Sequence, residues 1–413
     1  MYNVLSFSAL SVAVKLLVGF LLTKLFAYFL GPSGLATLGN LKNVTQLLSS
    51  YGSMGMQSGI IRFSSEFKLH KHKITELLGT LNIIFTISSL VGGFFVYFFS
   101  DELAQTIFQD RSLNFIFKIT AVLLPMHGFH LMYYALLQGF GNYKRVVGQD
   151  ILMNLLKITL AAFMILNYGL TGALLTIVTL PSIYFFLSVF NVSKSLNVFK
   201  VNWSTSVAKN LGLYSLMSLF SSIAIPLIYI LIRNRITLTL GPENAGYWEA
   251  VNQFSFFYFM ALQSVIMMYV LPRISANSNI SFFRRQIKEY FVKLMPGFIV
   301  FLLLLFLFRD SIIWLLLTAN FNAVSDLMMW QLLGDVFRAS SLILLAYVHA
   351  RRLIKHYIMV DLVFSISMLL FSYLFIEFFG LIGAVQAHFV SYFLYFSINV
   401  FLLRKPLFLS ANE

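Results

Sequence analysis

Six cationic side chains interrupt segments that are otherwise hydrophobic enough to cross a bilayer: Lys15, Lys24, Lys42, Lys118, Lys157 and Arg338. A charge at membrane depth costs at least ~2.5–3.5 kcal/mol, so it usually faces a water-filled cavity or a charged partner. Because all six are positive, the chemistry they favour is the binding of an anion along a path across the membrane.

Acidic side chains inside such segments offer a second kind of chemistry. Asp335 and Arg338 lie three residues apart and therefore on one helical face. In one interpretation they form a buried pair that anchors the helix. In the other, Asp335 is functional: it releases Arg338 when a phosphate arrives, or it carries a proton during transport. Glu249, at the start of another segment, is a further coupling candidate that could line an outer vestibule.

Other polar residues have plainer interpretations. Asp150 and Asp361 begin helices and are expected to serve the helix dipole. His127, His130 and His388 lie on apolar helices, where histidines are usually hydrogen-bonded members of the core. The chain has no cysteine, which excludes disulfides and thiolate sites, and we expect no bound metal and no resident cofactor.

The elements that carry these residues are membrane-spanning helices. The 413 residues are 59% hydrophobic and 11% charged, whereas soluble domains carry ~25% charged residues. Runs such as 298–308 are continuously apolar, which favours helices over the alternating strands of a β-barrel. Polar punctuation divides the chain into twelve expected spans, at 8–30, 37–60, 77–100, 113–138, 150–168, 170–192, 211–232, 247–271, 290–308, 325–349, 357–379 and 382–403.

Positive residues are concentrated in alternate connections between these spans. With the N-terminus inside, eighteen Lys and Arg residues fall on the cytoplasmic side and four on the opposite side, which is a strong positive-inside bias. We therefore expect both termini in the cytoplasm. Most of the net charge of +14 lies in these basic loops, which contact anionic membrane lipids. The charge therefore does not require nucleic acid as a partner.

The cations differ in their expected depth. Lys15 and Lys157 each lie seven residues from a cytoplasmic end, ~10 Å deep at ~1.5 Å per helical residue. Arg338 lies near the middle of its span and is too deep to reach the interface cheaply. Long side chains nearer the outer ends can extend to the interface instead, which leaves open the orientation of Lys24, Lys42 and Lys118.

The chain repeats itself at a spacing near 211 residues. The matching segments are 30–32 with 240–242, 34–40 with 246–252, and 169–173 with 380–384. Similar offsets align Asp150 with Asp361, and Asn40 with Asn252. Several matches at a nearly constant offset indicate an internal duplication.

Two copies of six helices run in the same direction through the membrane, as in transporters built from parallel repeats. We expect an N-terminal bundle at 1–192, a basic linker at 193–210 and a C-terminal bundle at 211–413. Such proteins bind their substrate between the halves and alternate access. Enzyme signatures, such as a long external loop, a phosphate-binding glycine loop or His-Glu-x-x-His, are missing, so we do not expect an enzyme.

Several segments carry a family resemblance. They are 29–35, 40–42, 226–233, 269–272, 309–317 and the run Trp330-Gln331-Leu332-Leu333-Gly334-Asp335. Together they resemble the Wzx-type lipid-linked oligosaccharide flippases, which export O-antigen and enterobacterial common antigen units. These flippases belong to the multidrug/oligosaccharidyl-lipid/polysaccharide exporter (MOP) superfamily, and the resemblance extends over essentially the whole chain.

The resemblance implies an all-α integral membrane protein with about twelve helices in two pseudo-symmetric bundles, as in the MATE transporters of that superfamily. The implied substrate is an undecaprenyl-pyrophosphate-linked oligosaccharide, moved by alternating access from the cytoplasmic to the periplasmic leaflet of a bacterial inner membrane. A polysaccharide polymerase and a chain-length regulator are candidate partners, and proton or sodium coupling is left open.

The family pattern has polar positions at six residues of this sequence: Lys15, Lys24, Asn40, Lys42, Asp335 and Arg338. Arg338 stands where the pattern has Lys, which keeps the charge but changes the hydrogen-bond geometry. Lys118 and Lys157 have no counterpart in this pattern, so their predicted role in substrate binding depends on their depth alone. Asn252 is a further candidate for substrate binding because it is the repeat partner of Asn40.

Three alternatives stay open. A cation-coupled multidrug exporter of the same fold should have an anionic cavity, whereas the intramembrane charge here is mostly basic. A membrane-embedded glycan polymerase or glycosyltransferase should have a long external loop with carboxylates. A channel with deep lysines would select small anions.

Overall fold

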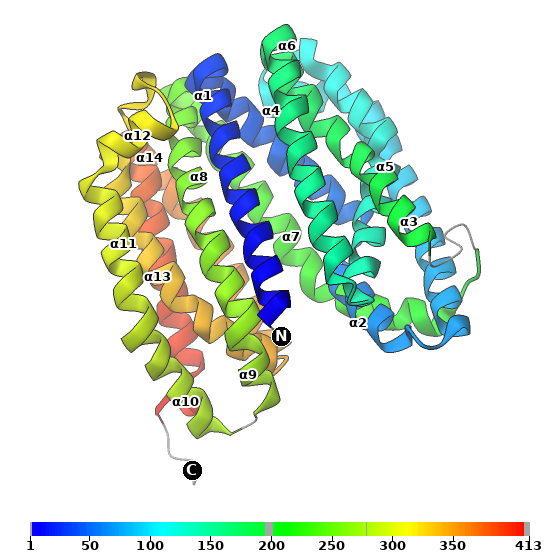
Figure 1. The fold of residues 1–413 in the computed structure, drawn as a ribbon. Coiled ribbons are helices and arrows are strands. Elements are labelled where there is room, and N and C mark those ends of the chain that lie inside the picture. The colour runs from blue at the N-terminus through cyan, green and yellow to red at the C-terminus, as the bar shows by residue number, and fades with distance from the viewer. Residues whose placement is uncertain (1, 195–200, 278, 409–413) are drawn as a thin grey trace. The chain divides into compact units, whose positions relative to one another are not determined.

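A computed structural model describes residues 2–194, 201–277 and 279–408, almost all of them helical (Figure 1). The helices are α1 (Tyr2–Gly52), α2 (Gln57–Phe67), α3 (Lys71–Phe98), α4 (Ser100–Phe108), α5 (Asn114–Gly139), α6 (Tyr143–Ser193), α7 (Thr205–Leu240), α8 (Pro242–Val265), α9 (Leu271–Ala276), α10 (Ile280–Glu289), α11 (Met295–Leu307), α12 (Arg309–Leu316), α13 (Val324–Ala350), α14 (Ile354–Leu402) and α15 (Arg404–Phe408). Short helical segments η1 (Arg111–Leu113), η2 (Ile266–Val270), η3 (Tyr290–Leu294) and η4 (Ala319–Phe321) connect them.

Glycines break the longest helices at the repeated motifs. Gly31 in α1, Gly169 in α6 and Gly380 in α14 have φ values of 64°, 54° and 61°. Gly241, the repeat partner of Gly31, has φ 98° between α7 and α8. Glycine adopts this left-handed region without the steric cost that a Cβ imposes. The repeat seen in the sequence therefore corresponds to equivalent sharp turns in the two halves.

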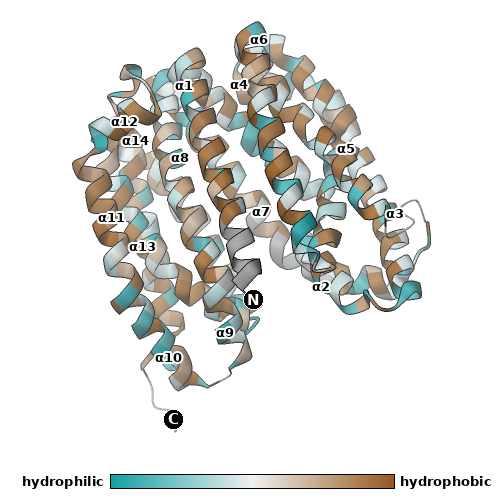
Figure 2. Ribbon diagram, in the orientation of Figure 1, coloured by the Kyte–Doolittle hydropathy of each residue, from teal (hydrophilic) through white to brown (hydrophobic). Residues whose placement is uncertain are grey.

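The expected class is confirmed: the chain is an all-helical, multi-pass membrane protein. Eight helices of the described part are long and apolar enough to cross a membrane. Three of these are divided by the glycine turns, and α8 supplies a further membrane-length helix, which accounts for the twelve expected spans. Hydrophobic residues dominate the long helices, and hydrophilic ones gather at α10 and where α2 meets α3 (Figure 2).

Contacts group the described chain into two compact units. The first unit comprises residues 1–30 and 37–230, and the second comprises residues 31–36 and 231–413. In the first unit α5 packs against α3 and α6, and in the second unit α13 packs against α8 and α14. The contact boundary falls inside α7, and residues 195–200 of the expected linker lie outside the described residues. The expected division at 193–210 stays a prediction.

Two expected span ends were wrong. The span expected at 37–60 ends at Gly52, because Met54 and Gly55 adopt φ values of 48° and 63° and start a turn before α2. The span expected at 211–232 is part of a longer helix, α7, which continues to Leu240. Arg233 therefore lies inside a helix rather than in an outer connection, because a buried acidic partner neutralises it.

Candidate functional site

An ammonium group without an acidic partner occurs on α6 in the first unit, within the part of the chain that the structure describes. The side chain of Lys157 is exposed, and among the described residues no acidic side chain forms an ion pair with it. Its charged neighbour is Lys42 of α1, close enough for the two charges to repel each other. Lys42 is half-buried, with its Nζ 5.7 Å from the centre of the Phe26 ring. We refer to Lys42 and Lys157 as the lysine pair.

Lys15 differs from this pair because it has an acidic partner. Its Nζ lies 2.7 Å from Oδ2 of Asp150 on α6, and the same oxygen accepts a hydrogen bond of 2.8 Å from Ser11 Oγ. The Tyr134 hydroxyl donates to the other carboxylate oxygen. Asp150 lies beyond the first turn of α6 and is buried, so its expected role at the helix dipole was wrong. It holds α1 and α5 against α6.

Asp150 and Lys157 lie on the same side of α6. Their separation of seven residues is two helical turns, and Asn154 lies between them at the i+4 position. The rise between Asp150 and Lys157 is therefore ~10 Å. One face of α6 thus carries first Asp150, the carboxylate that neutralises Lys15 of α1, and then Lys157, which no carboxylate of the described residues neutralises.

The remaining candidates of the first unit take different places. Asn40 is buried, and its Nδ2 donates to the Ile107 carbonyl of α4 over 2.7 Å, which is a structural contact. Lys24 on α1 and Lys118 on α5 are half-buried. Their participation in binding stays a prediction.

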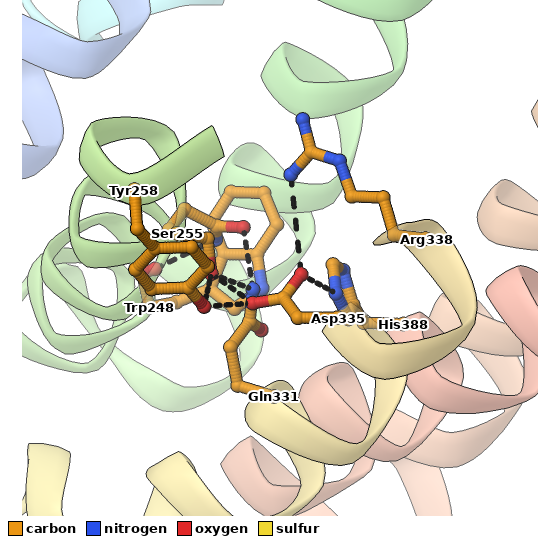
Figure 3. Close-up of polar contacts among 8 residues, drawn as sticks. Trp248, Ser255, Tyr258, Gln331, Asp335, Arg338 and His388 are labelled. Atoms are coloured by element: carbon orange, nitrogen blue, oxygen red, sulfur yellow. Dashed lines mark hydrogen bonds and ion pairs between the residues drawn. The ribbon is translucent and has the colours of Figure 1, made fainter. Parts of the chain in front are cut away.

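A second polar cluster centres on Asp335 in the second unit (Figure 3). Its fully buried carboxylate accepts hydrogen bonds from Ser255 Oγ at 2.5 Å, from the Tyr258 hydroxyl and from His388 Nε2 at 3.1 Å. Arg338 Nη1 lies 4.0 Å away. We refer to these side chains, together with Gln331, as the Asp335 network. It comprises Ser255, Tyr258, Gln331, Asp335, Arg338 and His388.

Further contacts extend the network. Gln331 Nε2 donates to Ser255 Oγ over 2.9 Å and lies 3.5 Å from Oδ1 of Asn252. The Asn252 amide itself donates to the Trp248 carbonyl over 2.7 Å. Asn252, a predicted substrate-binding residue, therefore borders the Asp335 network instead of the lysine pair.

Close packing of α13 on α14 brings His388 to Asp335. A Cβ at Gly334 would lie 2.5 Å from Cδ2 of His388 and 3.0 Å from the Cα of Phe389, so only glycine allows this approach. Sequence reasoning treated His388 as an ordinary core histidine. Its pairing with Asp335 depends on residues 53 positions apart, for which the sequence offers no periodic signal.

Arg338 is the accessible edge of the Asp335 network. Its side chain is 23% exposed, whereas that of Asp335 is fully buried. The guanidinium lies over the Phe259 ring at 4.0 Å and near the Tyr392 ring at 5.5 Å. Aromatic faces stabilise a cation without neutralising it, so Arg338 keeps its positive charge at the edge of the Asp335 network.

Glu249 forms a separate buried ion pair. Arg233, 1% exposed, donates to its carboxylate, and Gln253 Nε2 donates to the other carboxylate oxygen over 3.1 Å. The guanidinium lies 5.4 Å from the Trp248 ring. Glu249 is thus buried within α8 and does not line an open vestibule, contrary to expectation.

The other histidines have structural contacts. His127 Nε2 bonds the Val178 carbonyl at 2.8 Å, and His130 Nδ1 bonds Ser188 Oγ at 2.9 Å. Within the described part of the chain, no group of three or more His, Asp or Glu side chains is arranged to hold a metal ion.

Comparisons with known proteins agree with this architecture. The sequence pattern of a family described as "Polysaccharide biosynthesis protein" matches residues 3–278. The lipid III flippases of Escherichia coli (strain K12) and Shigella flexneri are each 25% identical, over 96% of this chain and 97% of theirs.

Solved structures share the fold. The lipid II flippase MurJ, in an inward closed conformation, has a TM-score of 0.77 at 15% identity, over 97% of this chain and 87% of MurJ. An inward-facing multidrug resistance transporter of the MATE family, within the MOP superfamily, has a TM-score of 0.75 at 15% identity, over 97% and 96% of the chains. The fold is therefore that of the MOP superfamily.

Proposed function

The chain belongs to the family of polysaccharide biosynthesis proteins, and we propose that it is a flippase for lipid-linked oligosaccharides. Support comes from the full-length similarity to two proteins named as lipid III flippases. A flippase moves an existing molecule between leaflets and needs no catalytic side chains.

The lysine pair carries the proposal at the level of chemistry. A diphosphate bears at least two negative charges, which cannot enter hydrocarbon without compensation. Two ammonium groups that repel each other are the complementary arrangement, because a dianion between them removes the repulsion and adds charge-assisted hydrogen bonds. We therefore propose an undecaprenyl-pyrophosphate-linked oligosaccharide as the substrate, with the diphosphate at Lys42 and Lys157.

The proposed cycle is alternating access in a bacterial inner membrane. With both termini in the cytoplasm, the substrate enters from the cytoplasmic leaflet and leaves into the periplasmic one. The polyprenyl tail stays in lipid while the charged and polar head passes through the protein. Lys15, held by Asp150, and Arg338, held at the Asp335 network, are candidates for further contacts along the path.

We propose the Asp335 network as the coupling site. It combines a carboxylate and an imidazole with a guanidinium, all buried or nearly so. With His388 neutral, Asp335 and Arg338 balance to zero charge, and one added proton makes the network cationic. Proton uptake would thereby strengthen the attraction of Arg338 for an anion. Proton coupling is favoured over sodium coupling because the donors to Asp335 already occupy its oxygens.

Reconstitution tests the function directly. Proteoliposomes are loaded with undecaprenyl diphosphate that carries a fluorescent oligosaccharide, and dithionite added outside quenches only the outer leaflet. We expect complete quenching with the protein and about half without it. A protected fraction equal to that of protein-free vesicles would contradict the proposal, and uptake of a cationic dye instead would favour the multidrug exporter.

A further inference from the structure

A cavity lies in the first unit where α1 ends and α2 begins. It has a volume of about 100 Å³ and is lined by Ser50, Ser53, Gly55, Gln57, Ser58, Leu131 and Ser222. This volume is below the ~300–1,000 Å³ typical of sites that enclose a whole small molecule, so the cavity accommodates a single sugar unit at most. We refer to it as the serine cavity.

The lining of the serine cavity is polar but uncharged. No Asp, Glu, Lys or Arg occurs between residues 43 and 61. In the described structure, the hydroxyls of Ser50 and Ser58 and the amide of Gln57 have no hydrogen-bond partner in the protein. Each hydroxyl can donate one hydrogen bond and accept others, and the amide can do both. These groups suit a neutral ligand with many hydroxyls, rather than an ion.

The turn that forms the cavity also exposes backbone donors. Met56, which precedes α2, has no side chain able to cap the helix. The first N–H groups of a helix have no partner within it. Because Gln57 and Ser58 form this first turn and line the cavity, backbone and side-chain donors occur together there.

The position of the cavity relative to Lys42 indicates the chemical class of the ligand. Gln46, Ser50 and Ser53 follow Lys42 at spacings of four, eight and eleven residues, which places all of them on one face of α1. Ser50 is ~12 Å along the helix from Lys42. Along this face of α1, a cation is followed by uncharged hydrogen-bonding groups. The same order occurs in a lipid-linked saccharide, where the anionic diphosphate is followed by the uncharged sugars.

We propose that the serine cavity receives one sugar unit of the lipid-linked substrate. Ser50, Gln57 and Ser58 hydrogen-bond its hydroxyl or acetamido groups, and Leu131 packs against an apolar face of a sugar ring. This inference rests on the proposed function. It assigns sugar recognition to the end of α1, while the lysine pair recognises the diphosphate.

Equilibrium binding of two tail-labelled lipids to the solubilised full chain tests the assignment. One lipid is undecaprenyl diphosphate, and the other is the same lipid carrying an N-acetylglucosamine disaccharide. In the variant Ser50→Ala/Ser58→Ala, we expect the disaccharide lipid to bind about tenfold more weakly, ~1.4 kcal/mol. Binding of the bare diphosphate should remain within about twofold of wild type.

A second variant fills the cavity instead of removing its polar groups. Ser58→Trp places a large ring at an exposed position of α2 and should weaken the disaccharide lipid further, again without affecting the bare diphosphate. Ser65→Trp, at another exposed serine of α2 outside the cavity lining, is the matched control. It should leave both affinities unchanged.

The outcomes separate the inference from the function. Equal weakening of both lipids, or no weakening of either, would overturn the saccharide assignment. Failure of the wild-type protein to bind either lipid would instead contradict the proposed function. A selective loss of the disaccharide lipid in both cavity variants supports the assignment.

Discussion

The two units share a repeat but treat their charges differently. In the first unit, Lys157 is exposed without an acidic partner and stands near Lys42. In the second unit, the guanidiniums of Arg233 and Arg338 lie beside carboxylates. The first unit therefore carries an ammonium group that no carboxylate of the described chain neutralises, whereas these two arginines of the second unit are paired with acids.

The repeat alignment shows how specific this difference is. The offsets that align the two halves place Phe254 opposite Lys42 and Met368 opposite Lys157, and both of these residues are buried and apolar. In the reverse direction, Leu124 stands opposite Asp335 and His127 opposite Arg338. The two halves therefore share their helices but differ in the polar side chains at these positions.

The largest effect is expected at the Arg233–Glu249 pair, where the change should act on stability. Arg233→Met leaves a buried carboxylate uncompensated, which costs ~3–5 kcal/mol. The double variant Arg233→Met/Glu249→Leu should regain most of the lost stability, because replacing a whole buried pair by apolar residues is often neutral. Thermal unfolding in detergent measures both. Equal stability of the single variant and the wild type would show that the pair is not a structural element.

The lysine pair should affect transport without affecting stability. Lys42→Ala/Lys157→Ala removes two charge-assisted hydrogen bonds of ~1.5–3 kcal/mol each, so we expect flipping to slow by at least ~100-fold. The proteoliposome assay measures this rate. Lys71→Ala, at the exposed start of α3, is the control and should be neutral. Undiminished flipping in the double variant would show that the lysine pair of the first unit does not bind the anionic part of the substrate.

The Asp335 network should control the pH response. Asp335→Asn keeps the shape but removes the carboxylate, so flipping should lose its dependence on a proton gradient and slow by about tenfold, ~1.4 kcal/mol. The titratable groups that face Asp335 are Tyr258 of α8, Arg338 of α13 and His388 of α14. His388→Gln retains a donor to Asp335 and should shift the pH profile without abolishing it. An unchanged profile in Asp335→Asn would exclude the network as the coupling site.

The smallest effect is expected at Asp150. Asp150→Asn releases Lys15 from a partly exposed ion pair, and such pairs contribute only ~0–1 kcal/mol. The affinity for undecaprenyl diphosphate should therefore rise by no more than about fivefold. A titration of the tail-labelled lipid measures it. A loss of affinity would mean that Asp150 positions Lys15 for the anion rather than competing with it.

Much of the fold could be predicted from residue type alone. Continuous apolar runs predicted the spans, and the expected span ends at 30, 168 and 379 each precede a glycine that turns the chain at positive φ: Gly31, Gly169 and Gly380. The ends near Met54 and Arg233 could not be predicted. The first depends on a local turn, and the second on a distant acid that makes a buried arginine tolerable.

The candidate site was predictable only as a set of residues. The intramembrane cations could be found because a charge in an apolar run is conspicuous, but depth along a helix does not reveal a partner. Lys15 and Lys157 were equivalent by depth, yet only Lys15 meets Asp150. The serine cavity gave no signal in the sequence, since serine is common in both helices and turns.

The sequence by itself determined that this chain is a duplicated, all-helical membrane protein with excess positive charge inside its spans. These properties follow from composition and spacing, which are local. Only the tertiary structure decided which charges are neutralised. Asp150 pairs with Lys15, Glu249 pairs with Arg233, and His388 contacts Asp335. The physical reason is that neutralisation acts over a few ångströms in space, between helices that the sequence separates by many residues.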